Sequence, residues 1–126
     1  MRVAQTLLWI DCSAGFLGGV VMLALRGWLS DIYGMPPSLL LAMAMANLAY
    51  GLFSFSLAVR RVRPRAMIVL LAVANATWAT ACGIAAIVLA STASIFGLAH
   101  LLIEGLLVGA LAAFEWRWRE LLLRAP

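Results

Sequence analysis

Residues Phe96–Arg119 read FGLAHLLIEGLLVGALAAFEWRWR, an apolar run that contains a histidine and a glutamate four positions apart. The run reaches the roughly 20 residues that a transmembrane helix needs. On a helix, this spacing places His100 and Glu104 on one face, one turn from each other. An ionisable pair within hydrocarbon is treated by default as a functional site. The stretch therefore predicts a membrane-spanning helix with His100 and Glu104 as a candidate functional pair.

The composition of the whole chain points the same way. Of its 126 residues, 66% are hydrophobic and 11% are charged, whereas soluble domains have about 25% charged residues. A water-soluble fold of this length could not bury so much apolar surface. We expect residues 1–126 to form a single domain of an integral membrane protein, with the lipid bilayer as its surroundings.

Four apolar segments are long enough to span a bilayer. Short connections make consecutive helices antiparallel neighbours, which predicts an all-α, up-down four-helix bundle. A short amphipathic tail, residues 117–126, is expected to lie along the membrane surface. The predicted spanning helices cover residues 4–25, 38–59, 66–90 and 94–116.

The basic residues predict the orientation. All nine are arginines, and Arg26 is the one that falls on the predicted outer side. Under the positive-inside rule both termini are cytoplasmic, as in a multi-pass protein of a bacterial inner membrane. The cluster at residues 60–65 is suited to anionic lipid headgroups, and nucleic-acid binding is not expected. The arginines of the inner side are Arg2, Arg60, Arg61, Arg63, Arg65, Arg117, Arg119 and Arg124.

The sequence contains no signature of an enzyme or of a cofactor site. Cys12 and Cys82 lie in separate apolar runs with no Cys-x-x-Cys spacing, so they are interpreted as small buried hydrophobic residues. The sequence has one histidine, no metal-ligand cluster and no nucleophile beside a plausible base. We predict neither an enzyme nor a bound metal or cofactor.

Polar residues recur within the predicted spans. At a rise of about 1.5 Å per residue, Asn47, Asn75 and Glu104 fall near the middle of a bilayer. His100 lies one turn nearer the outer side, and Asp11 lies toward the inner side. These five residues are our candidates for a polar column that relays protons or forms a proton-coupled binding site. In the alternative, Glu104 is protonated and hydrogen-bonded, and the polar residues only hold the helices together.

Two Gly-x-x-x-Gly pairs predict faces on which another helix backbone can approach closely. Gly15 and Gly19 form the first pair, and Gly105 and Gly109 form the second. Such faces allow close packing within the bundle or dimerisation. We therefore expect a homo-oligomer or a place in a larger membrane complex.

Aromatic residues and arginines mark the expected membrane interfaces. On the outer side, Trp28 and Tyr33 lie in a segment predicted to form a short interfacial helix that breaks at Gly34. Proline follows at positions 36 and 37, where the next helix should begin. On the inner side the expected anchors are Trp116, Arg117, Trp118 and Arg119.

Two groups of proteins resemble the chain. Small multidrug transporters are similar in length and helix number, and they carry an acidic residue in the first helix, where this chain has Asp11. The chain more closely resembles uncharacterised bacterial four-helix inner-membrane proteins, on the residues Asp11, Gly34–Pro36, Asn75–Trp78 and Glu115. This second resemblance implies the fold and no assigned activity.

Two functions follow as hypotheses. The ionisable residues in apolar helices indicate a small proton-coupled transporter or ion pathway. The glycine faces and the small extramembrane mass indicate instead a non-catalytic subunit that packs against a larger membrane complex.

Overall fold

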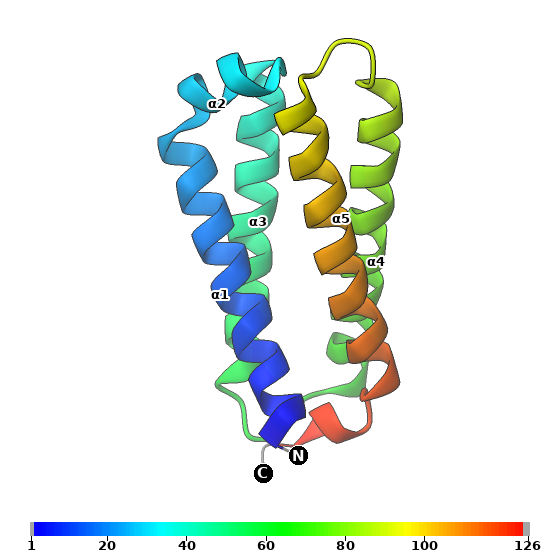
Figure 1. The fold of residues 1–126 in the computed structure, drawn as a ribbon. Helices are drawn as coiled ribbons and strands as arrows, with labels where there is room; N and C mark the ends of the chain where they lie inside the picture. Colours follow the sequence, from blue (N-terminus) through cyan, green and yellow to red (C-terminus); the bar gives the residue numbers. More distant parts are fainter. Residues whose placement is uncertain (1, 125–126) are drawn as a thin grey trace.

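The computed structural model describes the backbone of residues 2–124 and the side chains of residues 5–124. This part of the chain is helical and contains no strand beyond one isolated bridge between Val62 and Arg124. The elements are α1 (Arg2–Ala24), α2 (Arg26–Tyr33), α3 (Pro37–Ala58), α4 (Arg65–Val88), α5 (Ile95–Arg117) and the 3-10 helix η1 (Leu121–Leu123). Figure 1 shows α1, α3, α4 and α5 side by side as four long helices, with α2 at one end and η1 at the other.

Four helices are long and apolar enough to cross a membrane, in agreement with the four predicted spans. Many of their large apolar side chains point outward: Leu17 is 69% exposed, Ile87 78% and Leu106 76%. A water-soluble monomer rarely exposes an apolar surface this extensive. An apolar outer surface is expected for a helical bundle in lipid, because lipid tails are as apolar as the side chains that face them.

The four long helices form two hairpins. The first pairs α1 with α3 and the second pairs α4 with α5, and the contacts between the hairpins are far fewer than those within them. Figure 1 shows the two pairs standing next to each other. The site described below lies between them.

Glycine allows the close approach of helices in both hairpins. A Cβ atom added to Gly15 would lie 2.9 Å from the Asn47 carbonyl oxygen, and one added to Gly19 would lie 3.0 Å from the Ala44 carbonyl oxygen. In the second hairpin the Gly105 position faces Cys82, with 3.3 Å from an added Cβ to the Cys82 Cβ. Gly109 similarly faces α4, at Ala79. Both Gly-x-x-x-Gly pairs therefore pack against helices of the same chain.

Local signals explain where the helices begin and end. The short helix α2 ends at Gly34, which has a φ of 65° in the left-handed region that favours glycine. Pro36 then caps α3, and Pro37 is its first residue, where no backbone N–H is needed. Ser94 caps α5 by accepting a hydrogen bond from the Gly97 N–H at 3.3 Å. The expected short helix and its break at Gly34 are confirmed.

The segment after α5 differs from the expected surface tail. It turns back under the bundle, as Figure 1 shows, and the side chain of Leu122 is fully buried in η1. The Arg63 backbone N–H donates to the Leu123 carbonyl at 2.7 Å. Leu122 thus packs into the core at this end of the bundle, whereas Leu121 is exposed.

Arg63 also differs from the expected lipid-facing cluster, since it is only 2% exposed. Its guanidinium donates to the carbonyls of Leu57 at 2.6 Å, Ala58 at 3.2 Å and Leu122 at 2.9 Å. It also donates to Gln5 Oε1 at 2.6 Å. Burial lowers the pKa of Arg63 below its ordinary value. This arginine fastens α1, the end of α3 and η1 together.

Two apolar clusters fill the ends of the bundle. We call them the inner cluster, beside η1, and the outer cluster, beside α2. The inner cluster consists of Leu7, Leu8, Leu57, Ala58, Ile68, Leu71, Leu111 and Leu122. The outer cluster consists of Met22, Leu29, Met35, Leu40, Met43, Ala44, Ala86 and Leu101.

Candidate functional site: a polar seam between two helical hairpins

Buried and half-buried polar side chains meet where the two hairpins face each other. We call this region the polar seam, and it comprises Asp11, Asn47, Asn75, His100, Glu104 and Glu115. Its hydrogen bonds from a donor on α3 to α5 and from a donor on α4 to α1 each join one hairpin to the other. All five predicted column residues are in the seam, where they form two groups around different carboxyl groups.

The outer group centres on Glu104. Asn47 Nδ2 donates to Glu104 Oε1 at 3.0 Å, and Glu104 Oε2 lies 3.5 Å from His100 Nε2. Cys82 Sγ lies 3.8 Å from the same oxygen. The predicted one-turn pairing of His100 with Glu104 is therefore present, and the amide of Asn47 adds a donor from the other hairpin.

Tyr33 extends the outer group to the short helix α2. Its hydroxyl lies 3.0 Å from His100 Nδ1, and the two ring centroids are 5.2 Å apart. Burial, assisted by the charge of Glu104, raises the pKa of Tyr33 above its ordinary value. Expected from sequence as a headgroup anchor, Tyr33 instead contacts the site, whereas Trp28 is 61% exposed.

The inner group centres on Asn75. Its Nδ2 atom donates to Asp11 Oδ2 at 3.1 Å and to Glu115 Oε1 at 2.5 Å. Asn75 is 2% exposed, Asp11 5% and Glu115 0%. Ser54 lies beside Asp11. Two carboxyl groups and one amide thus share a site that solvent does not reach.

Glu115 is not among the predicted site residues, because it lies two positions before the end of α5, directly before the predicted interface anchors. Side chains on a helix tilt toward its N-terminus, so the carboxyl group of Glu115 extends back along α5 into the bundle. The spacing of the two glutamates in the sequence does indicate a place for Glu115 in the site. Glu115 follows Glu104 by 11 residues, about three helical turns, which places both glutamates on one face.

A cavity of about 60 Å³ lies between the two groups. Asp11, Asn47, Asn75 and Glu104 line it together with the aromatic residues Tyr50 and Trp78. Two polar atoms, the Tyr50 hydroxyl and Trp78 Nε1, are buried without a hydrogen-bond partner among the described residues. The cavity lies between the two hairpins, has both polar and apolar side chains in its lining, and is large enough for water.

The electrostatic character of the seam is acidic. Neither arginine nor lysine lines the cavity. Within residues 2–124, no three His, Cys, Asp or Glu side chains lie close enough together to hold a metal ion. The donors near the carboxyl groups include the amides of Asn47 and Asn75, the Cys82 thiol and the His100 imidazole. Such an arrangement can hold and exchange protons.

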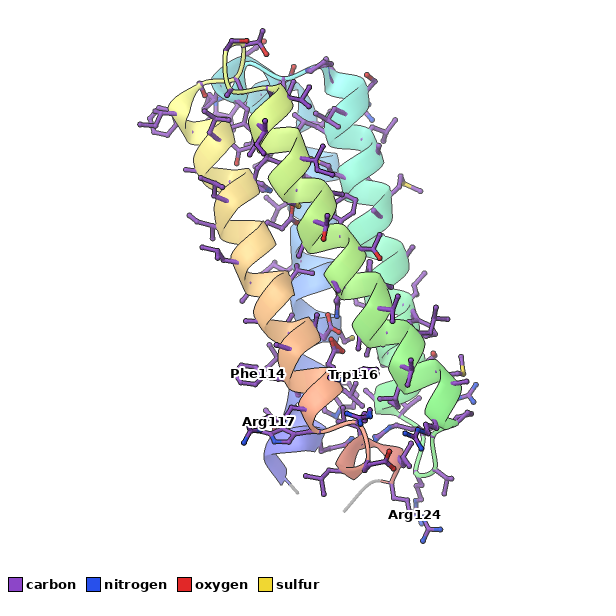
Figure 2. The ribbon with its side chains drawn as sticks, turned by 90° about the vertical axis from the view of Figure 1, so that its right-hand side faces the viewer. Phe114, Trp116, Arg117 and Arg124 are labelled. Atoms are coloured by element: carbon purple, nitrogen blue, oxygen red, sulfur yellow. The ribbon has the colours of Figure 1, made fainter. Side chains whose placement is uncertain are left out.

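The residues predicted as inner anchors surround the end of α5. Trp116 is 50% exposed, and the guanidinium of Arg119 lies 4.3 Å from the centroid of its ring. Phe114 and Trp118 stack with centroids 5.3 Å apart. Figure 2 shows Phe114 and Arg117 pointing away from the bundle at this end. Exposed aromatic rings beside arginines are suited to a membrane–water boundary.

No protein-family model, curated protein or solved structure matches the chain. Its class therefore follows from the fold and the seam alone. Residues 2–124 form an all-helical bundle with four helices long and apolar enough to span a membrane and an acidic seam between the two hairpins.

Proposed function

We propose that the chain is a small multi-pass protein of the bacterial inner membrane whose polar seam serves proton-coupled transport or an ion pathway. One observation carries this proposal. Asp11 and Glu104 come from different hairpins, yet both line one buried cavity. Because each hairpin contributes a group that can exchange protons, protonation in the cavity would be coupled to movement of the hairpins relative to each other.

Stability alone is a weak reason for the seam. Hydrogen bonds between helices in a membrane contribute about 0.6 kcal/mol on average and about 1.7 kcal/mol at best. Burying several ionisable groups costs more than a few such bonds return. A functional role for the carboxyl groups accounts for their presence better than a purely structural one.

The proposed orientation places both termini in the cytoplasm. The arginines supply the support: Arg60, Arg61 and Arg65 lie at the same end of the bundle as Arg117 and Arg124, whereas Arg26 lies at the other end. This distribution follows the positive-inside rule. The end closed by η1 would then face the cytoplasm.

Reconstitution into liposomes tests the transport proposal. A pH-sensitive dye inside the vesicles would report proton movement under an imposed membrane potential, between about pH 5 and 8, where histidine and perturbed carboxyl groups titrate. We expect flux in the native protein and its loss in Asp11→Asn and Glu104→Gln. Asp31→Asn is the control, because Asp31 is exposed on α2. If both seam variants match the native protein, the transport proposal is wrong.

The alternative proposal is an accessory subunit of a larger membrane complex. The glycine pairs are occupied within the chain, so they do not support it. A shallow groove of about 370 Å³ on α4 and α5 does, because small residues such as Ala76, Gly109 and Ala113 line it. Purification in mild detergent would show a partner that Ala76→Leu releases. A monomer without a partner would argue against this role.

A further inference from the structure

The cavity contains two features that the proposed function does not use, Tyr50 and Trp78. Each lies one turn from a seam asparagine, since Asn47 precedes Tyr50 and Asn75 precedes Trp78 by three residues. Residues three apart share a helix face. The repeated spacing on α3 and α4 therefore brings both aromatic residues to the cavity.

The unpartnered atoms of these residues restrict what can occupy the cavity. The indole N–H of Trp78 can only donate a hydrogen bond, so its partner must be an acceptor. The carboxyl groups of Asp11 and Glu104 accept hydrogen bonds when ionised. A metal cation provides no acceptor for the indole, whereas water accepts from Trp78 and donates to a carboxylate.

The size of the cavity agrees with water. One water molecule needs roughly 10–15 Å³ of such space and two to four polar partners. The cavity measures about 60 Å³, which admits more than one water molecule. Partners are available from the two asparagines, the two carboxyl groups, Tyr50 and Trp78.

Asp11 lines this space and forms a carboxyl pair with Glu115, which does not itself line the cavity. Asp11 and Glu115 both accept from Asn75, and two neighbouring carboxyl groups in an apolar interior do not both ionise. The pair therefore retains a proton. Beyond it, the inner cluster, with Leu8, Leu57 and Leu71 fully buried, separates the pair from the arginine-rich end.

We infer that the species handled by the seam is the proton, which passes between Glu104 and the Asp11–Glu115 pair through a short chain of water molecules held by Tyr50 and Trp78. This inference rests on the proposed transport function and assigns its ion. In this conformation the pair exchanges protons toward His100 and Tyr33, because the inner cluster closes the other side. The titratable groups facing the seam are Cys12 on α1, Tyr33 on α2, Tyr50 on α3, Cys82 on α4 and His100 on α5.

Conservative variants in liposomes test the water chain. Tyr50→Phe and Trp78→Phe remove one polar atom each and retain an aromatic ring. We expect each to slow proton flux by about tenfold, the equivalent of one lost buried hydrogen bond. Trp28→Phe is the matched control, since Trp28 is exposed on α2, and it should leave the flux unchanged. Flux in Na⁺ or K⁺ gradients at constant pH should be absent.

The outcomes separate this inference from the proposed function. Flux that depends on Asp11 but is carried by Na⁺ or K⁺ would overturn the inference and leave an ion pathway in place. Native proton flux in both Tyr50→Phe and Trp78→Phe would overturn the water chain. Flux of no ion would overturn both.

Infrared spectroscopy of the purified protein provides a readout that needs no transport. We expect the native protein to show an O–H band of internal water that changes when the carboxyl groups are protonated. Tyr50→Phe and Trp78→Phe should alter this band, and Trp28→Phe should not. A band that is the same in all four proteins would overturn the inference.

Discussion

Asn75 provides one amide nitrogen to two carboxyl groups, and no other side chain in the seam does so. Asn47, its counterpart on α3, provides a donor to Glu104 alone among the carboxyl groups. The difference has an energetic consequence, because a buried acceptor that loses its donor costs the full desolvation of that group.

We therefore predict that Asn75→Ala destabilises the protein by about 1.5–3 kcal/mol, above the average for a hydrogen bond in a membrane, because it leaves two carboxyl groups without their donor. Unfolding in mixed detergent micelles measures the change. Thr77→Ala is the matched control on α4, since Thr77 is exposed and its hydroxyl bonds to its own helix at Val73. Equal stability of the two variants would contradict the prediction.

Glu115 and Glu120 offer a second comparison at the residue scale. Glu115 is fully buried beside Asp11, whereas Glu120 pairs on the surface with Arg65 at 3.1 Å. We predict that Glu115→Gln removes a protonated-carboxyl band from the infrared spectrum at neutral pH, since the buried pair retains a proton. Glu120→Gln should leave that band intact and change stability by no more than about 1 kcal/mol. A band that survives Glu115→Gln would show that another carboxyl group holds the proton, and a native protein without the band would show that both carboxyl groups are ionised.

At the level of the helices, the close packing of α1 against α3 depends on the glycines of α1. Gly15 faces the backbone of α3 at Asn47 and Gly51, and an added Cβ would lie 2.9 Å from each. Backbone atoms cannot move aside as a flexible side chain can. A methyl group at this position must therefore separate the helices and with them Asp11 and Asn47.

Gly15→Ala should accordingly destabilise the protein by about 1–3 kcal/mol, the usual cost of overpacking. Gly83→Ala on α4 is the matched control, because nothing lies within 4 Å of an added Cβ there. That variant should be neutral or more stable by up to about 1 kcal/mol, since alanine favours a helix over glycine. The same unfolding assay compares the two variants. If the stability of Gly15→Ala equals that of the native protein, α1 and α3 can separate at this point without cost.

The whole molecule is closed at one end by a single buried side chain. Arg63 joins Gln5, the end of α3 and η1 through four hydrogen bonds. No carboxylate takes part in these bonds, so the carbonyl groups at the C-terminus of α3 supply the complementary charge. The inner cluster lies directly behind this contact, at Leu57 and Leu122.

For Arg63→Ala we predict a loss of about 2–4 kcal/mol in stability, because several buried acceptors lose a charged donor at once. Proteolysis should then cleave the chain near residues 118–124, which Arg63 no longer holds against the bundle. Arg61→Ala is the control, since Arg61 is exposed, and it should change stability by less than about 0.5 kcal/mol. Identical digestion patterns would exclude a closing role for Arg63.

Much of the fold could be predicted because length and hydropathy report directly on helices that span lipid. Gly34 and the two prolines after it mark a turn through their own backbone preferences, which hold in any context. The pairing of His100 with Glu104 likewise follows from helix geometry. What could not be predicted were contacts between helices, since the four spans could have packed around one another in several ways.

By itself, the sequence determined that this chain is helical, apolar on its outside and equipped with ionisable groups in its spans. The tertiary structure alone decided how those groups are shared: Asn47 with Glu104, and Asn75 with Asp11 and Glu115. It also decided that Arg63 and η1 turn inward to close the bundle. The reason is physical, because periodicity specifies the face of one helix, whereas a partner depends on how two helices are rotated and offset against each other.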